Sequence, residues 1–178
     1  MKRISFQMVC GGRMKKLFFV ILANFLISVF AIAQPISGTF AIQNTVTGKN
    51  LRPYEAGNQN GNRIVLYNHV EWKCMTWQFI KAKENTYQLK NLFTSKTFQP
   101  SSKAIAGVSL EQQPIKDEPG QYWEFIKQGD NLYLIRLQGS DLYITTSSEN
   151  TNSSVILQPK LAKTSSQLWK LVEQHPTM

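Results

Sequence analysis

The sequence predicts an all-β domain in which twelve strands form three pseudo-symmetric repeats of about 46 residues. Tryptophan recurs at intervals of 46 residues, at Trp77, Trp123 and Trp169. A second aromatic residue recurs at intervals of 46 or 47 residues, at Phe40, Tyr87 and Tyr133. Between these positions, apolar and polar residues alternate in short runs, a pattern that is typical of half-buried strands.

Each repeat contains four such runs in the same order. The first run is GTFAIQN, NTYQLKN or NLYLIRL, and the fourth is TWQFI, YWEFI or LWKLV. The second run begins at positions that we take as equivalent, namely Asn50, Thr97 and Asp141. The third run begins likewise at Arg63, Gly107 and Ser154. The connections are rich in Gly, Asn, Ser, Thr and Pro, as turns are, so we expect four strands in each repeat.

Three repeats of four strands restrict the architecture further. A repeat of roughly 40–45 residues could be a propeller blade, but propellers have about 4–8 blades and three would not close a ring. We therefore predict a β-trefoil with repeats at about residues 38–84, 85–129 and 130–174. The three recurring tryptophans are expected in its shared core.

The N-terminal segment, residues 1–33, has the pattern of a secretory signal peptide. Two lysines precede a 14-residue apolar run, and an Ala-x-Ala site ends at Ala33. We expect cleavage after Ala33 and a domain of residues 34–178, and the prefix before Met14 resembles an overextended start site. Because a membrane span needs about 20 apolar residues, no stable membrane anchor is expected. The protein is therefore predicted to be secreted or periplasmic.

The charge of the chain changes once this segment is set aside. The whole chain has a net charge of +9, but five of its basic residues lie in residues 1–33. The remainder has 15 basic and 11 acidic residues, a net charge of +4, and its Lys and Arg residues are scattered. Nucleic-acid-binding domains usually carry a clustered basic stripe, so no nucleic-acid partner is expected.

Cys74 is the only cysteine after residue 33, so no intrachain disulfide is expected. A domain of this length can bury a sufficient core without one, and we interpret Cys74 as a small buried hydrophobe. The sequence has no H-E-x-x-H, C-x-x-C, phosphate-loop or G-x-S-x-G motif. We expect a monomer that needs neither a metal nor a cofactor.

Two of the tryptophans lie in a recognisable motif. Gln121-Tyr122-Trp123 and Gln167-Leu168-Trp169 match the Q-x-W signature of ricin-B-type lectin domains, whereas Met75-Thr76-Trp77 keeps only the tryptophan. The segments GTFAIQNTVTGKNL and GNRIVLYN also resemble the first and third strands of such a repeat. The resemblance extends from Gly38 to about Glu173, and it implies a β-trefoil that binds carbohydrate.

In that family, a sugar site combines an Asp on the second strand, an aromatic residue at the end of the third strand and a polar side chain. The Asp and the polar group bind sugar hydroxyls, and the aromatic ring stacks on the apolar face of the sugar. This sequence departs from the pattern in every repeat. The expected Asp positions hold Arg52, Gln99 and Tyr143. The expected aromatic positions hold Tyr67, Glu111 and Gln158.

The first repeat is the best candidate site. Tyr67 or Trp72, which is expected to be exposed, would stack on the sugar, and three polar residues would bind its hydroxyls: Arg52, Asn62 and Asn68. In the alternative interpretation, Tyr67 packs on its strand neighbours and Trp72 only covers a hairpin. The third repeat offers a weaker set, Asp141, Tyr143 and Gln158.

We therefore expect a non-enzymatic, lectin-like module that binds a glycan or polysaccharide. The acidic residues Asp117, Glu118 and Asp130 lie in turn-like segments, and nothing suggests the paired acids across a cleft that glycoside hydrolysis needs. The alternative is a β-trefoil with degenerate sugar sites that acts as a protein-interaction module or as a protease-inhibitor-like protein. Its partner would then contact the loops at residues 54–62 or 145–153.

Overall fold

The computed structural model describes residues 34–177, which contain twelve β-strands and only short 3-10 helices. The predicted signal peptide, residues 1–33, lies outside this part of the chain. Within residues 34–177, no helix is long and apolar enough to cross a membrane. The predicted all-β class and the twelve strands are confirmed.

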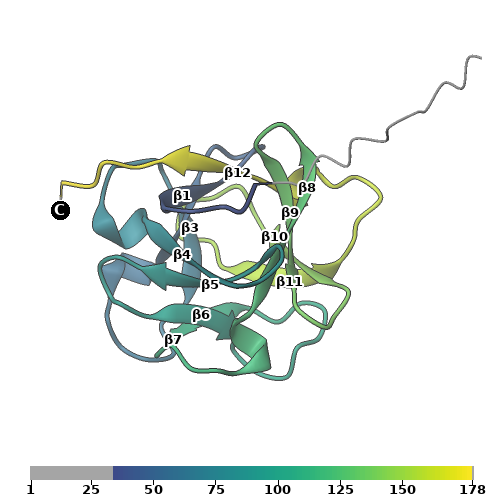
Figure 1. Cartoon of the computed structure of the whole chain (residues 1–178), viewed down its shortest axis with the longest axis horizontal. Helices are drawn as coiled ribbons and strands as arrows, with labels where there is room; N and C mark the ends of the chain where they lie inside the picture. Colours follow the sequence, from purple (N-terminus) through teal and green to yellow (C-terminus); the bar gives the residue numbers. More distant parts are fainter. Residues whose placement is uncertain (1–33, 178) are drawn as a thin grey trace, which may run out of the picture. The chain divides into compact units, whose positions relative to one another are not determined.

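Six strands close a barrel, because the first and fourth strands of each repeat pair with each other and with the adjacent repeats. They are β1 (Thr39–Asn44), β4 (Trp77–Lys83), β5 (Thr86–Asn91), β8 (Trp123–Gly129), β9 (Leu132–Leu137) and β12 (Leu168–Glu173). Antiparallel pairing runs in the order β1, β4, β5, β8, β9 and β12, and β12 pairs again with β1. In Figure 1 the last strand, β12 in yellow, accordingly lies beside β1.

The other six strands form one hairpin in each repeat. The pairs are β2 (Asn50–Pro53) with β3 (Ile64–Tyr67), β6 (Thr97–Pro100) with β7 (Leu110–Gln113), and β10 (Leu142–Thr146) with β11 (Val155–Pro159). Isolated bridges connect the hairpins at Val65–Ser154, Ser109–Ile156 and Arg63–Glu111. The three hairpins therefore meet one another and complete a β-trefoil.

Four short 3-10 helices lie in the connections. The first, η1 (Tyr54–Ala56), follows β2. The other three each precede the fourth strand of a repeat: η2 (Lys73–Met75), η3 (Pro119–Gln121) and η4 (Ser165–Gln167). These three helices end at Met75, Gln121 and Gln167, the first position of the Q-x-W motif in each repeat, and the fourth strand follows within two residues.

The recurring tryptophans join the barrel to the hairpins. Trp77, Trp123 and Trp169 are fully buried. Each indole Nε1 donates a hydrogen bond to a second-strand carbonyl of its own repeat, namely that of Leu51 (3.0 Å), Phe98 (3.3 Å) and Ile144 (3.0 Å). A buried indole N–H without an acceptor would destabilise the fold, so these bonds allow complete burial. The same bond in each repeat accounts for the constant spacing of the tryptophans.

These hydrogen bonds correct two strand alignments made from the sequence. In the third repeat, Ile144 rather than Leu142 is equivalent to Leu51. In the second repeat, strand pairing places the buried Gln112 where the first repeat has Leu66. Each correction is a shift of two residues. A shift of one residue would exchange the two faces of the strand, but a shift of two preserves the alternation, so the hydrophobic pattern could not reveal it.

Candidate functional site

The candidate sites lie on the face of each hairpin that is opposite to the barrel core. Because side chains alternate across a strand, Asn50 and Arg52 of β2 share this face with Tyr67 of β3. A loop of the third repeat covers part of it, since the Asn152 N–H donates to the Leu66 carbonyl at 2.8 Å. Asn50 and Arg52 are consequently buried although they do not belong to the hydrophobic core.

Three of the predicted site residues come together in the first repeat. The Cζ atom of Arg52 lies 3.4 Å from the centroid of the Tyr67 ring, which is a cation–π contact. The rings of Tyr67 and Trp72 are stacked, with their centroids 6.3 Å apart and their planes inclined by 28°. Both rings are half-buried, so Trp72 is less exposed than predicted. Arg52 occupies one face of Tyr67, and a sugar would have to stack on the remaining surface of this aromatic pair.

Arg52 is buried without full hydrogen bonding. Its side chain is 6% exposed, and none of the ion pairs among residues 34–177 includes it. Its Nη2 donates to Asn152 Oδ1 at 3.4 Å, and its Nε is buried with no acceptor. Nearby on β2, Asn50 Nδ2 lies 2.8 Å from His69 Nδ1, but Asn50 Oδ1 has no donor. The first-repeat site therefore has unused hydrogen-bonding groups.

Cys74 lies beside Arg52, in η2. Burial raises the pKa of the Cys74 thiol, and the nearby charge of Arg52 only partly opposes this effect. The thiol is therefore protonated at neutral pH, whereas a reactive cysteine would need a lowered pKa. This environment agrees with the interpretation of Cys74 as a small buried hydrophobe.

The two asparagines predicted for this site have different roles. Asn62 is 7% exposed, and its Nδ2 donates to the carbonyls of Tyr54 (2.8 Å) and Gly57 (3.0 Å). Asn62 thus fixes the loop before β3, and the prediction that it binds sugar hydroxyls is corrected. Asn68 is exposed, and its Oδ1 accepts a hydrogen bond from Thr151 Oγ1 at 3.4 Å. Asn68 directly follows Tyr67 in the chain.

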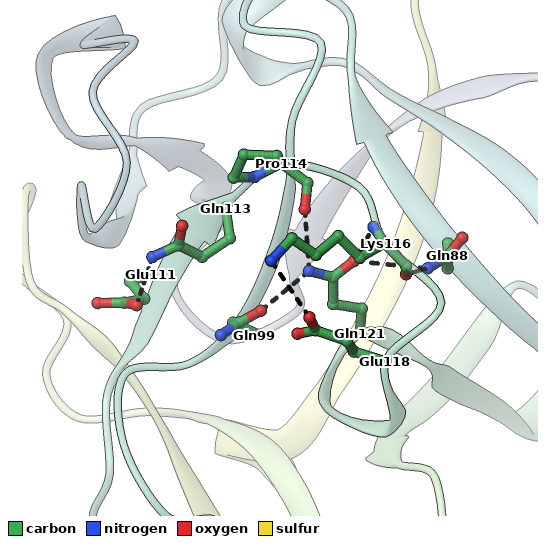
Figure 2. Close-up of polar contacts among 8 residues, drawn as sticks. All are labelled: Gln88, Gln99, Glu111, Gln113, Pro114, Lys116, Glu118 and Gln121. Carbon is green, nitrogen blue, oxygen red and sulfur yellow. Dashed lines mark hydrogen bonds and ion pairs between the residues drawn. The ribbon is translucent and has the colours of Figure 1, made fainter.

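The second repeat has a polar version of the site (Figure 2). Strand pairing places Gln99 at the position of Arg52 and Gln113, rather than the predicted Glu111, at the position of Tyr67. The Gln113 Nε2 donates to Glu111 Oε1 at 2.8 Å, as Figure 2 shows. This site offers hydrogen-bonding groups, but the position of the stacking ring holds an amide.

In the third repeat, the corrected register moves the expected residues. Thr145, rather than Tyr143, is equivalent to Arg52. Tyr143 pairs with Arg136 of β9 and is only 7% exposed. The prediction that Tyr143 supplies a platform for a sugar is therefore corrected, because its ring is covered.

The other two candidates of the third repeat are polar and lie nearer the surface. Gln158 is half-buried and holds the position that Tyr67 holds in the first repeat. Asp141 is exposed, and its Oδ1 lies 3.8 Å from Arg136 Nη1. Neither residue is part of an aromatic stack, so this repeat lacks the arrangement found in the first.

The glutamines of the Q-x-W motif fix the loop before the fourth strand. In Figure 2, Gln121 Oε1 accepts the Lys116 N–H (2.8 Å), and its Nε2 donates to the Pro114 carbonyl (3.0 Å) and to Gln99 Oε1 (2.9 Å). Gln167 makes the equivalent contacts in the third repeat, with Leu161, Pro159 and Thr145. These glutamines are therefore structural. They also donate hydrogen bonds to Gln99 and Thr145, which hold the position of Arg52 in the second and third repeats.

The first repeat lacks this arrangement, because Met75 stands where the other repeats have glutamine. A thioether cannot supply the amide groups that bind Gln99 or Thr145 in the other repeats. Arg52 is consequently left with one long hydrogen bond, the neighbouring Cys74 thiol and the ring of Tyr67, none of which carries a negative charge. Arg52 therefore lacks an amide partner because the first repeat has lost the glutamine of the Q-x-W motif.

The sequence did not indicate every residue of the first-repeat site. Asn152 is 100 positions from Arg52, and only the fold brings the third-repeat loop to it. His69 contacts the site through Asn50. Asn50 could have been found, because strand alternation places it on the same face as Arg52, two positions away.

The comparisons with known proteins agree with the fold. Residues 73–159 match the model of the family described as ricin-type beta-trefoil lectin domain-like. No curated protein is similar enough in sequence to count as a match. The fold is thus a β-trefoil, and the resemblance to ricin-type lectin domains that the sequence predicted is confirmed.

Solved structures support the same class. The designed threefold-symmetric protein ThreeFoil has a TM-score of 0.72 at 18% identity, over 76% of this chain and 98% of that one. The ricin B-like lectin of Macrolepiota procera, solved with lactose, has a TM-score of 0.66 at 16% identity, over 79% of this chain and 99% of that one. At these identities the likeness establishes the fold.

The same fold also occurs within larger chains. The exo-β-1,3-galactanase 1,3Gal43A from Clostridium thermocellum has a TM-score of 0.70 at 21% identity, over 78% of this chain but 30% of that one. The family and the fold together support a carbohydrate-binding module.

Proposed function

We propose that this chain is a secreted or periplasmic, non-enzymatic module that binds a glycan or polysaccharide as a monomer, chiefly through its first repeat. The observation that carries the proposal is the stacked pair of Tyr67 and Trp72 on the outer face of the first hairpin. Aromatic rings bind the C–H face of a sugar, while polar groups bind its hydroxyls. Asn68 and Arg52 supply such groups beside the pair.

The first repeat is preferred over the other two because it combines both kinds of contact. The second repeat has amides and a carboxylate but holds Gln113 where the ring would be. In the third repeat, the Tyr143 ring is covered. We expect one working site of modest affinity, which only repetition of the ligand or tethering of the module would raise.

The surroundings of the acidic residues support a non-enzymatic role. Asp117 accepts a hydrogen bond from the Tyr122 hydroxyl at 2.8 Å, and Glu118 lies 3.4 Å from Lys116 Nζ. Both carboxylates are thus engaged with neighbours in one turn, whereas a glycosidase holds two acids about 5–10 Å apart on either side of the scissile bond. The export pattern of residues 1–33 supports a role outside the cytoplasm.

Titration against a panel of oligosaccharides tests the proposal. Trp72→Ala should abolish detectable binding, because it removes half of the stacked pair. Phe93→Ala is the matched control, since Phe93 is an aromatic residue 54% exposed in the turn between β5 and β6. Equal binding by wild type and Trp72→Ala, or no binding of any oligosaccharide, would contradict the proposal.

A further inference from the structure

We infer that the first-repeat site is selective for sugars that carry an anionic substituent, a carboxylate or a sulfate, and that Arg52 is the residue that selects them. This inference rests on the proposed function, because it names the ligand class of the same site. The basis is a buried cation that the rest of the fold does not neutralise.

The charge of Arg52 is buried. A guanidinium that is 6% exposed has lost most of its hydration, and buried charges are normally paired with an opposite charge. No ion pair among residues 34–177 includes Arg52. The ring of Tyr67, 3.4 Å from Cζ, compensates for part of this loss, but a ring carries no net charge. A bound anion would supply the missing partner.

The guanidinium of Arg52 also lacks strong hydrogen bonds. Arg52 Nε is buried without an acceptor, and Nη2 has a neutral acceptor, Asn152 Oδ1, at 3.4 Å. Hydrogen bonds from a guanidinium to an anionic oxygen are typically about 2.7–2.9 Å long and roughly twice as strong as neutral ones. Asn152 lies in the connection between β10 and β11, so an anionic oxygen could replace it without disturbing a strand.

Arg52 lies next to the aromatic pair. Arg52 and Trp72 both contact the ring of Tyr67, one through its guanidinium and the other through its indole. A single monosaccharide could therefore rest on the aromatic pair while its substituent reaches Arg52. The unpartnered Asn50 Oδ1, on the same strand face, adds an acceptor for a hydroxyl group.

The other repeats provide an internal comparison. At the position of Arg52 they have Gln99 and Thr145, which are neutral and are hydrogen-bonded to Gln121 and Gln167. Only the first repeat combines a cation at this position with an aromatic stack. Selectivity for anionic sugars is therefore expected from one repeat, and a single substitution should remove it.

The test uses oligosaccharides in matched sets: uronic-acid oligosaccharides, the neutral oligosaccharides made from them by carboxyl reduction, and sulfated neutral oligosaccharides. Binding of each set to the full chain is measured by calorimetric titration at fixed ionic strength. We expect the acidic members to bind at least tenfold more tightly than their reduced counterparts. The sulfated set shows whether a carboxylate or a sulfate is the preferred anion.

Two variants identify the residue responsible. Arg52→Gln, which copies the second repeat, should lower the affinity for acidic sugars to that for neutral ones. Arg63→Gln should keep the preference, because Arg63 is an exposed cation of the same hairpin that stacks on Tyr54 at 4.7 Å. Since Arg52→Gln removes an unpaired buried charge, its urea midpoint should equal or exceed that of the wild type.

The outcomes separate this inference from the function on which it rests. Equal binding of acidic and reduced oligosaccharides would overturn the selectivity but leave carbohydrate binding intact. A preference that survives in Arg52→Gln, or that is lost in Arg63→Gln, would show that Arg52 does not select the ligand and overturn the inference. A large fall in the urea midpoint of Arg52→Gln would assign Arg52 a structural role and overturn it too. Failure of all three sets to bind would overturn both.

Discussion

The guanidinium of Arg52 and the ring of Tyr67 are in direct contact, with 3.4 Å between Cζ and the ring centroid. In the family that the sequence resembles, an Asp and an aromatic residue are expected at these two positions. The aromatic residue is kept, but the acid is replaced by a base. The site thus keeps an aromatic surface for sugar stacking, but a positive side chain stands where the family has a negative one that binds sugar hydroxyls.

The first prediction concerns the tryptophan core. Trp169→Phe keeps an aromatic ring but removes the N–H that donates to the Ile144 carbonyl at 3.0 Å. A buried carbonyl without its donor costs about 1–3 kcal/mol. The free energy of unfolding in urea should therefore fall by roughly that amount, and Trp169→Ala should cost about 3–5 kcal/mol. An unchanged unfolding free energy for Trp169→Phe would show that the bond contributes nothing.

The second prediction concerns the motif glutamine of the second repeat. Gln121→Met copies the first repeat and removes the acceptor of the Lys116 N–H and the donor to Pro114 and Gln99. We expect a loss of about 1–3 kcal/mol in unfolding free energy and faster hydrogen exchange at the Lys116 amide. Tyr122→Phe, a neighbouring change that spares these bonds, serves as the control. Unchanged exchange at Lys116 would contradict a structural role for Gln121.

These contacts show how far the sequence could predict the fold. The positions of Trp77, Trp123 and Trp169 could be predicted because each indole has the same acceptor in its own repeat. The alignment of Gln112 could not be predicted. Its side chain is buried because its amide donates hydrogen bonds to the carbonyls of Gly57 and Gln59, which lie in a loop of another repeat. No local pattern in the sequence encodes such a contact.

The candidate site was predicted less completely than the fold. Tyr67 and Trp72 were found because they are aromatic residues near the third strand, and the fold brings them together. Asn62 was misinterpreted, because a buried asparagine that binds two loop carbonyls has the same sequence signature as one that binds hydroxyls. Asn152 was missed because it reaches Arg52 from a different repeat.

The third prediction concerns the reactivity of Cys74. Burial raises the pKa of its thiol, so the folded state keeps the proton at a pH where the unfolded chain, with a thiol pKa of about 8.5, loses it. The contribution of this group to stability is therefore present below that pH and decreases as the pH rises above it. Iodoacetamide should modify Cys74 much more slowly in the native protein than in urea.

Peptide mass spectrometry measures this rate for Cys74 separately from Cys10, the other cysteine of the chain. Free glutathione in the same reaction provides the control for reagent activity, because the predicted cleavage after Ala33 would remove Cys10 from the domain. Equal rates for Cys74 in the native and unfolded protein would show that its thiol is accessible and contradict the burial on which the pKa argument depends.

A crystal structure would show directly whether the first repeat binds carbohydrate through Tyr67 and Trp72. Crystals would be soaked in a mixture of neutral monosaccharides and hexuronic acids, which samples all three repeats in one experiment. We expect a sugar ring against Trp72 or Tyr67, with a substituent near Arg52. A sugar bound at the second or third repeat but absent from the first would contradict it.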